Sequence, residues 1–143
     1  MKTKIVSFIA SLVLVILTFT GCATLFGDTA TLQRVTTAAK VAANTGTFLY
    51  LQKHPEQRPA FVAARDQLIQ IETSEHVDMA LLLSIVQRLP VDKLDSPTAQ
   101  ILISNASILI TDFAGNLPVE KLDDLKPVAK AIREGIDLAL AAK

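Results

Sequence analysis

The sequence predicts an all-α protein, a compact bundle of about five short helices that follows an apolar N-terminal segment. Half of the residues are hydrophobic, whereas only 5% are aromatic and only five are glycine, a composition that favours helices. No stretch alternates apolar and polar residues between hairpin turns, as strands would. Six prolines separate apolar runs that have helical spacing, so the helices are expected to be short.

The first helix is expected from about residue 28 or 29 to about residue 53, with Asp28 as a suitable N-cap. Ala38, Ala42 and Gly46 form a row of small residues four apart along it. Such a row allows helices to approach closely, either in a dimer or within one domain. Because this helix also carries charged residues and several threonines, we expect the row to pack against another helix of the same domain.

The motif HPEQRP (residues 54–59) ends the first helix, since a proline disfavours the helical conformation in the residue before it. A proline also suits the first turn of a new helix. The second helix is expected over residues 56–72, with a buried face made of Phe61, Ala64, Leu68 and Ile71. The next break, TSEHVD, supplies two candidate caps, Ser74 and Asp78, for a third helix over residues 78–88.

A short motif occurs twice: LPVDKLD (residues 89–95) returns as LPVEKLD (residues 117–123). Each copy follows one predicted helix and precedes another, so both are expected to be helix–helix corners. Proline stops the first helix, and the valine and second leucine are expected to pack into the core. The closing aspartate, Asp95 or Asp123, is expected to cap the next helix or to stand just before it. A pair of binding surfaces is the alternative interpretation.

The fourth helix is expected over residues 97–114, with Ser96 as N-cap and Pro97 at the first position. A fifth is expected over residues 124–142, despite Pro127 in its first turns. The fourth helix is apolar nearly all round, which predicts the buried centre of the bundle. Its apolar residues are Ile101, Leu102, Ile103, Ala106, Ile108, Leu109, Ile110 and Phe113.

The N-terminal segment has the layout of a secretory signal peptide. Lys2 and Lys4 precede an uncharged run over residues 5–19. A helix of that length rises about 22 Å, less than the ~30 Å hydrocarbon core of a bilayer. The segment is therefore left out of the fold prediction.

The motif FTGC (residues 19–22) resembles the lipobox of bacterial lipoproteins. The resemblance implies cleavage between Gly21 and Cys22, which leaves Cys22 as the first residue and as the site of lipid attachment. A mature lipoprotein of this kind carries three acyl chains, palmitate among them. One buried acyl chain binds a bilayer marginally and two or more hold firmly, so the lipid anchor is expected to keep the protein on a membrane. An ordinary signal peptide and an uncleaved anchor helix are the alternative interpretations of the segment.

The predicted organisation is therefore a cleaved signal peptide (1–21), a short lipidated tether (22–27) and a helical domain (28–143). Ala23 follows the cysteine where an aspartate would favour retention in the inner membrane. By resemblance to the enterobacterial sorting pattern, we expect the periplasmic side of the outer membrane in a diderm source. In a source with one membrane, we expect the outer face of the cell membrane.

The mature chain would carry 12 basic and 14 acidic side chains, which gives no basic footprint for nucleic acid. We expect no enzyme, catalytic residue, cofactor or metal site. His54 and His76 are far apart in the sequence, and the neighbouring carboxylates Asp123 and Asp124 are typical of a helix start. The single cysteine allows no disulfide within the chain.

The expected function is structural or protein-interaction, in a lipid-anchored envelope protein with an envelope protein as its partner close to the membrane. One alternative is a binder or sensor of a small apolar ligand held between aliphatic helices. Another is a phage-type exclusion lipoprotein. The stretch over residues 38–59 faintly resembles small uncharacterised helical proteins of bacteria and their phages, and that resemblance implies no functional residue.

Overall fold

The computed structural model describes residues 29–89 and 93–142, and within these ranges it contains helices and no strand. The all-α fold class is confirmed, and every expected helix is present close to its expected bounds. The N-terminal segment with Cys22 and the predicted Asp28 cap lies outside the described residues. The helices are α2 (Thr29–Lys53), η1 (Pro55–Gln57), α3 (Arg58–Thr73), α4 (Met79–Gln87), α5 (Pro97–Asn116), η3 (Val119–Asp124) and α6 (Leu125–Ala141), where η marks a 3₁₀-helix.

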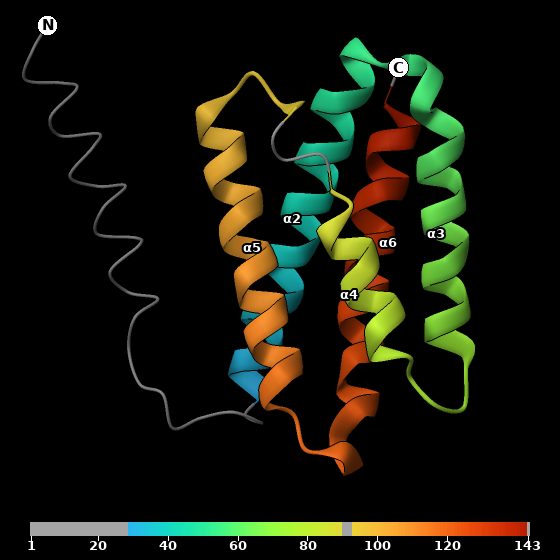
Figure 1. Cartoon of the computed structure of the whole chain (residues 1–143), viewed down its shortest axis with the longest axis vertical. Coiled ribbons are helices and arrows are strands. Elements are labelled where there is room, and N and C mark those ends of the chain that lie inside the picture. The colour runs from blue at the N-terminus through green and yellow to red at the C-terminus, as the bar shows by residue number, and fades with distance from the viewer. Residues whose placement is uncertain (1–28, 90–92, 143) are drawn as a thin grey trace, which may run out of the picture.

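The α-helices form a bundle in which successive helices alternate in direction (Figure 1). The first and last, α2 and α6, run in the same direction and share the most extensive interface. α3 packs on α6, α5 packs on α2, and the short α4 bridges the two flanks. The start of α2 and the corner between α5 and α6 lie at the same end of the bundle (Figure 1).

The contact between α2 and α6 is tightest at Gly135. A Cβ atom built on Gly135 would lie 2.9 Å from the Cβ of Ala43 and 2.9 Å from the backbone nitrogen of Asn44, and it would also collide with the carbonyl oxygen of Lys40. The α6 backbone therefore lies directly against the α2 backbone.

The row of small residues on α2 faces α5. A Cβ atom on Gly46 would lie 2.8 Å from Cδ1 of Ile103, and Ala42 is buried in a cluster with Ala99, Ile103 and Ala106 of α5. The expectation that this row packs inside the domain is confirmed. α2 thus uses one small-residue face for α6 and another for α5.

The expectation that the fourth helix is the buried centre of the bundle is wrong. α5 buries one face, including Ile103, Ile110 and Phe113, but Ile101 is 58% exposed and Ile108 is 59% exposed. The central helix is α6, whose buried residues include small ones such as Ala129, Gly135 and Ala139. Because small side chains let α6 approach α2 and α3 closely, α6 takes the centre and α5 lies at the edge.

Two of the predicted caps are confirmed. The carboxylate of Asp78 accepts a hydrogen bond from the Leu81 amide at 2.9 Å at the start of α4. The hydroxyl of Ser96 accepts one from the Ala99 amide at 3.3 Å at the start of α5. Ser74 instead follows the last turn of α3, where its hydroxyl donates to the Ile71 carbonyl at 2.9 Å.

The two copies of the repeated motif are corners, although residues 90–92 of the first copy lie outside the described residues. Leu94 is buried and Leu122 is partly buried against the core. Asp95 and Asp123 stand just before the N-cap positions of α5 and α6, which is one of the two positions expected for them. Asp95 forms an ion pair with Lys53, and Asp123 forms one with Lys126.

The expectation that the valine of the second copy packs into the core is wrong, because Val119 is 82% exposed. Val119 opens η3 at the tip of the bundle, one 3₁₀ turn before Leu122. η3 lies at one end of the bundle (Figure 1), and none of its residues is buried, although Leu122 packs against the core.

Gly135→Ala is expected to destabilise the fold by about 1–3 kcal/mol, because the added methyl group meets backbone that cannot rotate away. Gly115→Ala on α5 is the matched control, since a Cβ there has no neighbour within 4 Å. It should be neutral or stabilising by about 0.4–1 kcal/mol. Thermal unfolding followed by circular dichroism measures both, and equal melting temperatures would contradict the tight α2–α6 contact.

Candidate functional site

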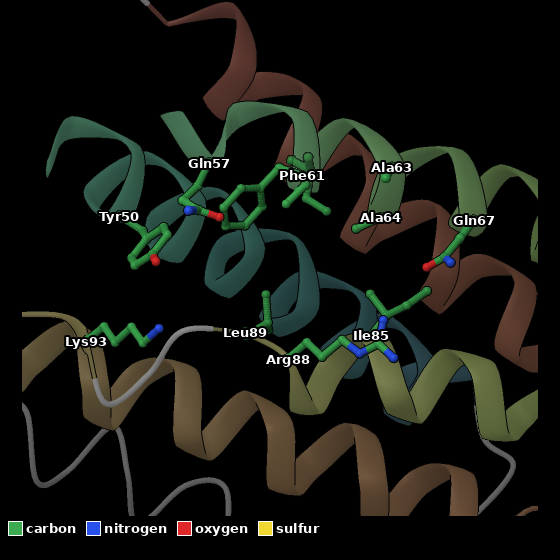
Figure 2. Close-up of a pocket in the computed structure, with 12 residues that line it drawn as sticks. Tyr50, Gln57, Phe61, Ala63, Ala64, Gln67, Ile85, Arg88, Leu89 and Lys93 are labelled. Atoms are coloured by element: carbon green, nitrogen blue, oxygen red, sulfur yellow. The ribbon is translucent and has the colours of Figure 1, made fainter. Parts of the chain in front are cut away.

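A groove of about 550 Å³ lies between α3 and α4. Phe61 and Ala64 of α3 line one wall, and Ile85 and Leu89 line the other (Figure 2). Ile136 of α6 also lines it. The groove has a mostly apolar lining, and its volume lies within the range usual for small-molecule sites.

The groove exists because α4 is too short to cover α3. α4 has nine residues and α3 has sixteen, so α4 does not extend over the part of α3 nearest η1. Phe61 and Ala64, which the sequence assigned to the buried face of the second helix, are only partly buried there, whereas Leu68 and Ile71 are fully buried. The predicted face is therefore correct, and its half nearest η1 forms the groove wall.

Polar and charged side chains surround the mouth of the groove. Arg88 and Lys93 lie along one side, and Tyr50, Gln57 and Gln67 contribute hydrogen-bonding groups on the other (Figure 2). No carboxylate lines the groove among the described residues. Sequence reasoning did not single out these five residues, because they come from four separate segments that only the tertiary fold brings together.

Neither histidine lines the groove. His54 follows α2, where its ring packs on Tyr50 with centroids 4.6 Å apart and its Nδ1 lies 3.4 Å from Oε1 of Glu56. His76 is exposed in the connection between α3 and α4. No group of three or more His, Cys, Asp or Glu among the described residues is placed to hold a metal ion.

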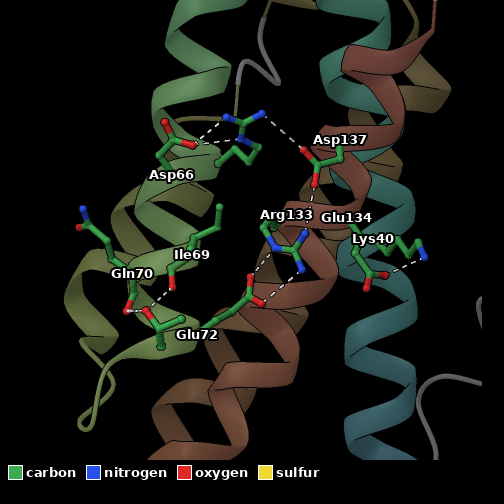
Figure 3. Close-up of polar contacts among 10 residues, drawn as sticks. Lys40, Asp66, Ile69, Gln70, Glu72, Arg133, Glu134 and Asp137 are labelled. Atoms are coloured by element: carbon green, nitrogen blue, oxygen red, sulfur yellow. Dashed lines mark hydrogen bonds and ion pairs between the residues drawn. The ribbon is translucent and has the colours of Figure 1, made fainter.

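An ion-pair network holds α3 to α6 on the outer side of the bundle (Figure 3). The guanidinium of Arg133 donates to both carboxylate oxygens of Glu72, at 2.6 and 3.3 Å, and to Asp137 at 3.1 Å. Arg65 of α3 lies between Asp66 and Asp137. The hydrogen bond to Glu72 raises the pKa of Arg133. Because these partners hold its guanidinium in place, Arg133 acts as a structural clamp between the two helices.

A second pair, Lys40 and Glu134, joins α2 to α6 at 2.8 Å (Figure 3). Its side chains are more exposed than those of Arg133 and Glu72. The hydrogen bond from Lys40 lowers the pKa of Glu134 below its usual value of 4.5. This pair therefore stabilises the fold above that value, and the contribution is lost as the pH falls through the lowered pKa.

Glu72→Gln is expected to destabilise the protein by roughly 1–2 kcal/mol, because it removes the charged partner of a partly buried guanidinium. Glu134→Gln changes the same atoms in a more exposed pair and should cost less. Thermal melts at neutral pH compare the two variants. A larger fall in melting temperature for Glu134→Gln than for Glu72→Gln would show that the pair of Arg133 with Glu72 is not the stronger of the two.

A second feature of the surface is the outward face of α5. Five exposed residues of α5 follow one another at spacings of three or four residues: Thr98, Ile101, Asn105, Ile108 and Asp112. We refer to these five residues as the α5 stripe. Residues 97–111 contain no charged side chain. The sequence identified the apolar character of this helix but assigned it to the core.

Comparison with known proteins adds no relative: no family model matches the chain, and no similar curated protein or solved structure was found. None of the helices that the structure describes has the length and apolar character needed to cross a membrane. The site residues are therefore interpreted from their own chemistry.

Proposed function

We propose that the protein is a lipid-anchored envelope protein with a structural or protein-interaction role close to the membrane. The anchor is supported by the FTGC motif, in which Cys22 would carry the lipid. The interaction role is carried by one observation, the exposed face of α5, on which no charged residue lies from Thr98 to Ile108.

The α5 stripe differs from an ordinary solvent-facing helix surface. Single exposed apolar residues are common, and Leu138 on α6, which is 52% exposed, is one of them. On α5, however, Ile101 and Ile108 lie on one face with no charged residue between them. Depletion of charge together with large apolar side chains is characteristic of the central part of a protein interface.

The proposed tether also favours a partner near the bilayer. Residues 22–27 reach about 20 Å at most when extended, so α2 would begin close to the membrane. The corner between α5 and α6 lies at that same end of the bundle (Figure 1). The α5 stripe would therefore face partners that are themselves held at the membrane surface.

Two variants of the full chain test this function. Cys22→Ser should abolish acyl labelling and leave the precursor unprocessed. Ile101→Lys/Ile108→Lys should remain acylated and melt like the parent, because both side chains are exposed. It should no longer be part of the larger complex that the parent chain forms. Sedimentation of mild-detergent extracts measures the complex.

Leu138→Lys is the control for the double variant, since it places one lysine at an isolated exposed leucine on α6. It should leave both acylation and the complex unchanged. Normal processing of Cys22→Ser to a soluble protein would exclude the lipid anchor. A parent chain that sediments as a monomer would exclude the interaction role.

The groove between α3 and α4 favours a second candidate function, the binding of a small apolar ligand. Ala64→Trp should fill the groove, whereas Ala30→Trp on the exposed start of α2 should not affect it. Lipid extraction and mass spectrometry of the purified chain should find a co-purifying molecule that Ala64→Trp loses and Ala30→Trp retains. No such molecule in the parent chain would count against this function.

A further inference from the structure

The groove between α3 and α4 is long enough for an extended alkyl chain. Its α3 wall runs from Gln57 to Gln67, which is about 15 Å of helix. Ile85 and Ile136 also line the groove and are buried, so its base is apolar. Three bonds of an extended chain cover at most ~3.6 Å, so about twelve carbons match the α3 wall in length.

The described charges that line the groove are all positive. Arg88 and Lys93 are exposed there, and neither forms an ion pair within the described ranges (Figure 2). Tyr50 and Lys93 also line a neighbouring hollow of about 210 Å³. The one described carboxylate that lines this hollow, Asp95, is already paired with Lys53. The groove therefore keeps two positive charges that no described residue neutralises.

We propose that the groove binds a fatty acid, with the alkyl chain on the apolar base and the carboxylate held by Arg88 and Lys93. The proposal rests on the second candidate function, ligand binding in this groove, and identifies the ligand class. Charge complementarity carries it, because a purely apolar ligand would leave both cations unpaired. The planar guanidinium of Arg88 can bind both oxygens of a carboxylate. The hydroxyl of Tyr50 and the amide of Gln57 are further donors at the mouth.

The start of α3 favours a carboxylate over a phosphate as the head group. Proteins commonly bind phosphate through free backbone N–H groups at a helix N-terminus or in a glycine-rich loop. α3 begins beside the groove at Gln57, but Pro59 in its first turn has no N–H, and the N–H of Arg58 already donates to the Pro55 carbonyl. No glycine lines the groove among the described residues. The head group is therefore held by side chains, among which Arg88 suits a carboxylate.

Photolabelling of the full chain tests the proposal. The probes are dodecanoic acid and dodecanol, each with a diazirine at the far end of the alkyl chain. Both should label residues that line the groove, and the acid should do so roughly three-fold to ten-fold more strongly, because it adds a partly exposed ionic contact. Unlabelled dodecanoate should compete with the acid probe. Mass spectrometry of the digested chain locates the label.

Two matched double variants separate the groove from the overall charge of the chain. Arg88→Gln/Lys93→Gln should melt like the parent, because both side chains are exposed, but it should lose the preference for the acid probe. Arg34→Gln/Lys121→Gln also removes one arginine and one lysine, at exposed positions of α2 and η3 that do not line the groove. This control should keep the preference.

Each other outcome overturns the proposal in a recognisable way. Equal labelling of the groove by the acid and the alcohol would exclude an anionic head group, and the ligand-binding function would stand. Stronger competition by dodecyl phosphate than by dodecanoate would exclude the carboxylate. Loss of the preference in the control variant as well would mean that overall charge, and not the groove, selects the acid. A groove that neither probe labels would contradict the ligand-binding function too.

Discussion

The contact between the backbones of α2 and α6 is the constraint on which the rest of the bundle depends. Gly135 allows the two helices to meet with no side chain between them, and the alanines of α2 at positions 39 and 43 match it from the other side. Once α6 lies this close to α2, α3 can pack on its free side and α5 on the free side of α2. α4 then fills the remaining space only in part, and the groove is what it leaves open.

Most of the helix boundaries could be predicted because they are set locally. Pro55 and Pro97 mark helix starts by their fixed backbone angle, and Asp78 and Ser96 supply side-chain caps. The central helix could not be predicted from apolar content. α5 has more large aliphatic residues than one face can bury, whereas α6 reaches the centre through small ones. Choosing between them requires knowing which pairs of helices approach closely.

The candidate sites were predictable only in part, for the same reason. Helical spacing identified Phe61 and Ala64 as an inward face, but only the short length of α4 turns them into a groove wall. Nothing in the local sequence marks Arg88 and Lys93 as site residues. They become candidates only because the tertiary fold places them beside the apolar groove. The apolar surface of α5 was visible in the sequence, and its outward half is the part that no described helix covers.

The pairing of α2 with α6 also has a consequence for when the chain can fold. The most extensive interface joins the first and last helices of the described residues, so it cannot form until α6 has been synthesised. A partly synthesised chain lacks the helix that buries Ala39 and Ala43, and contacts between distant segments form late in folding. We therefore expect the emerging polypeptide to stay loosely structured until α6 is available to pack on α2.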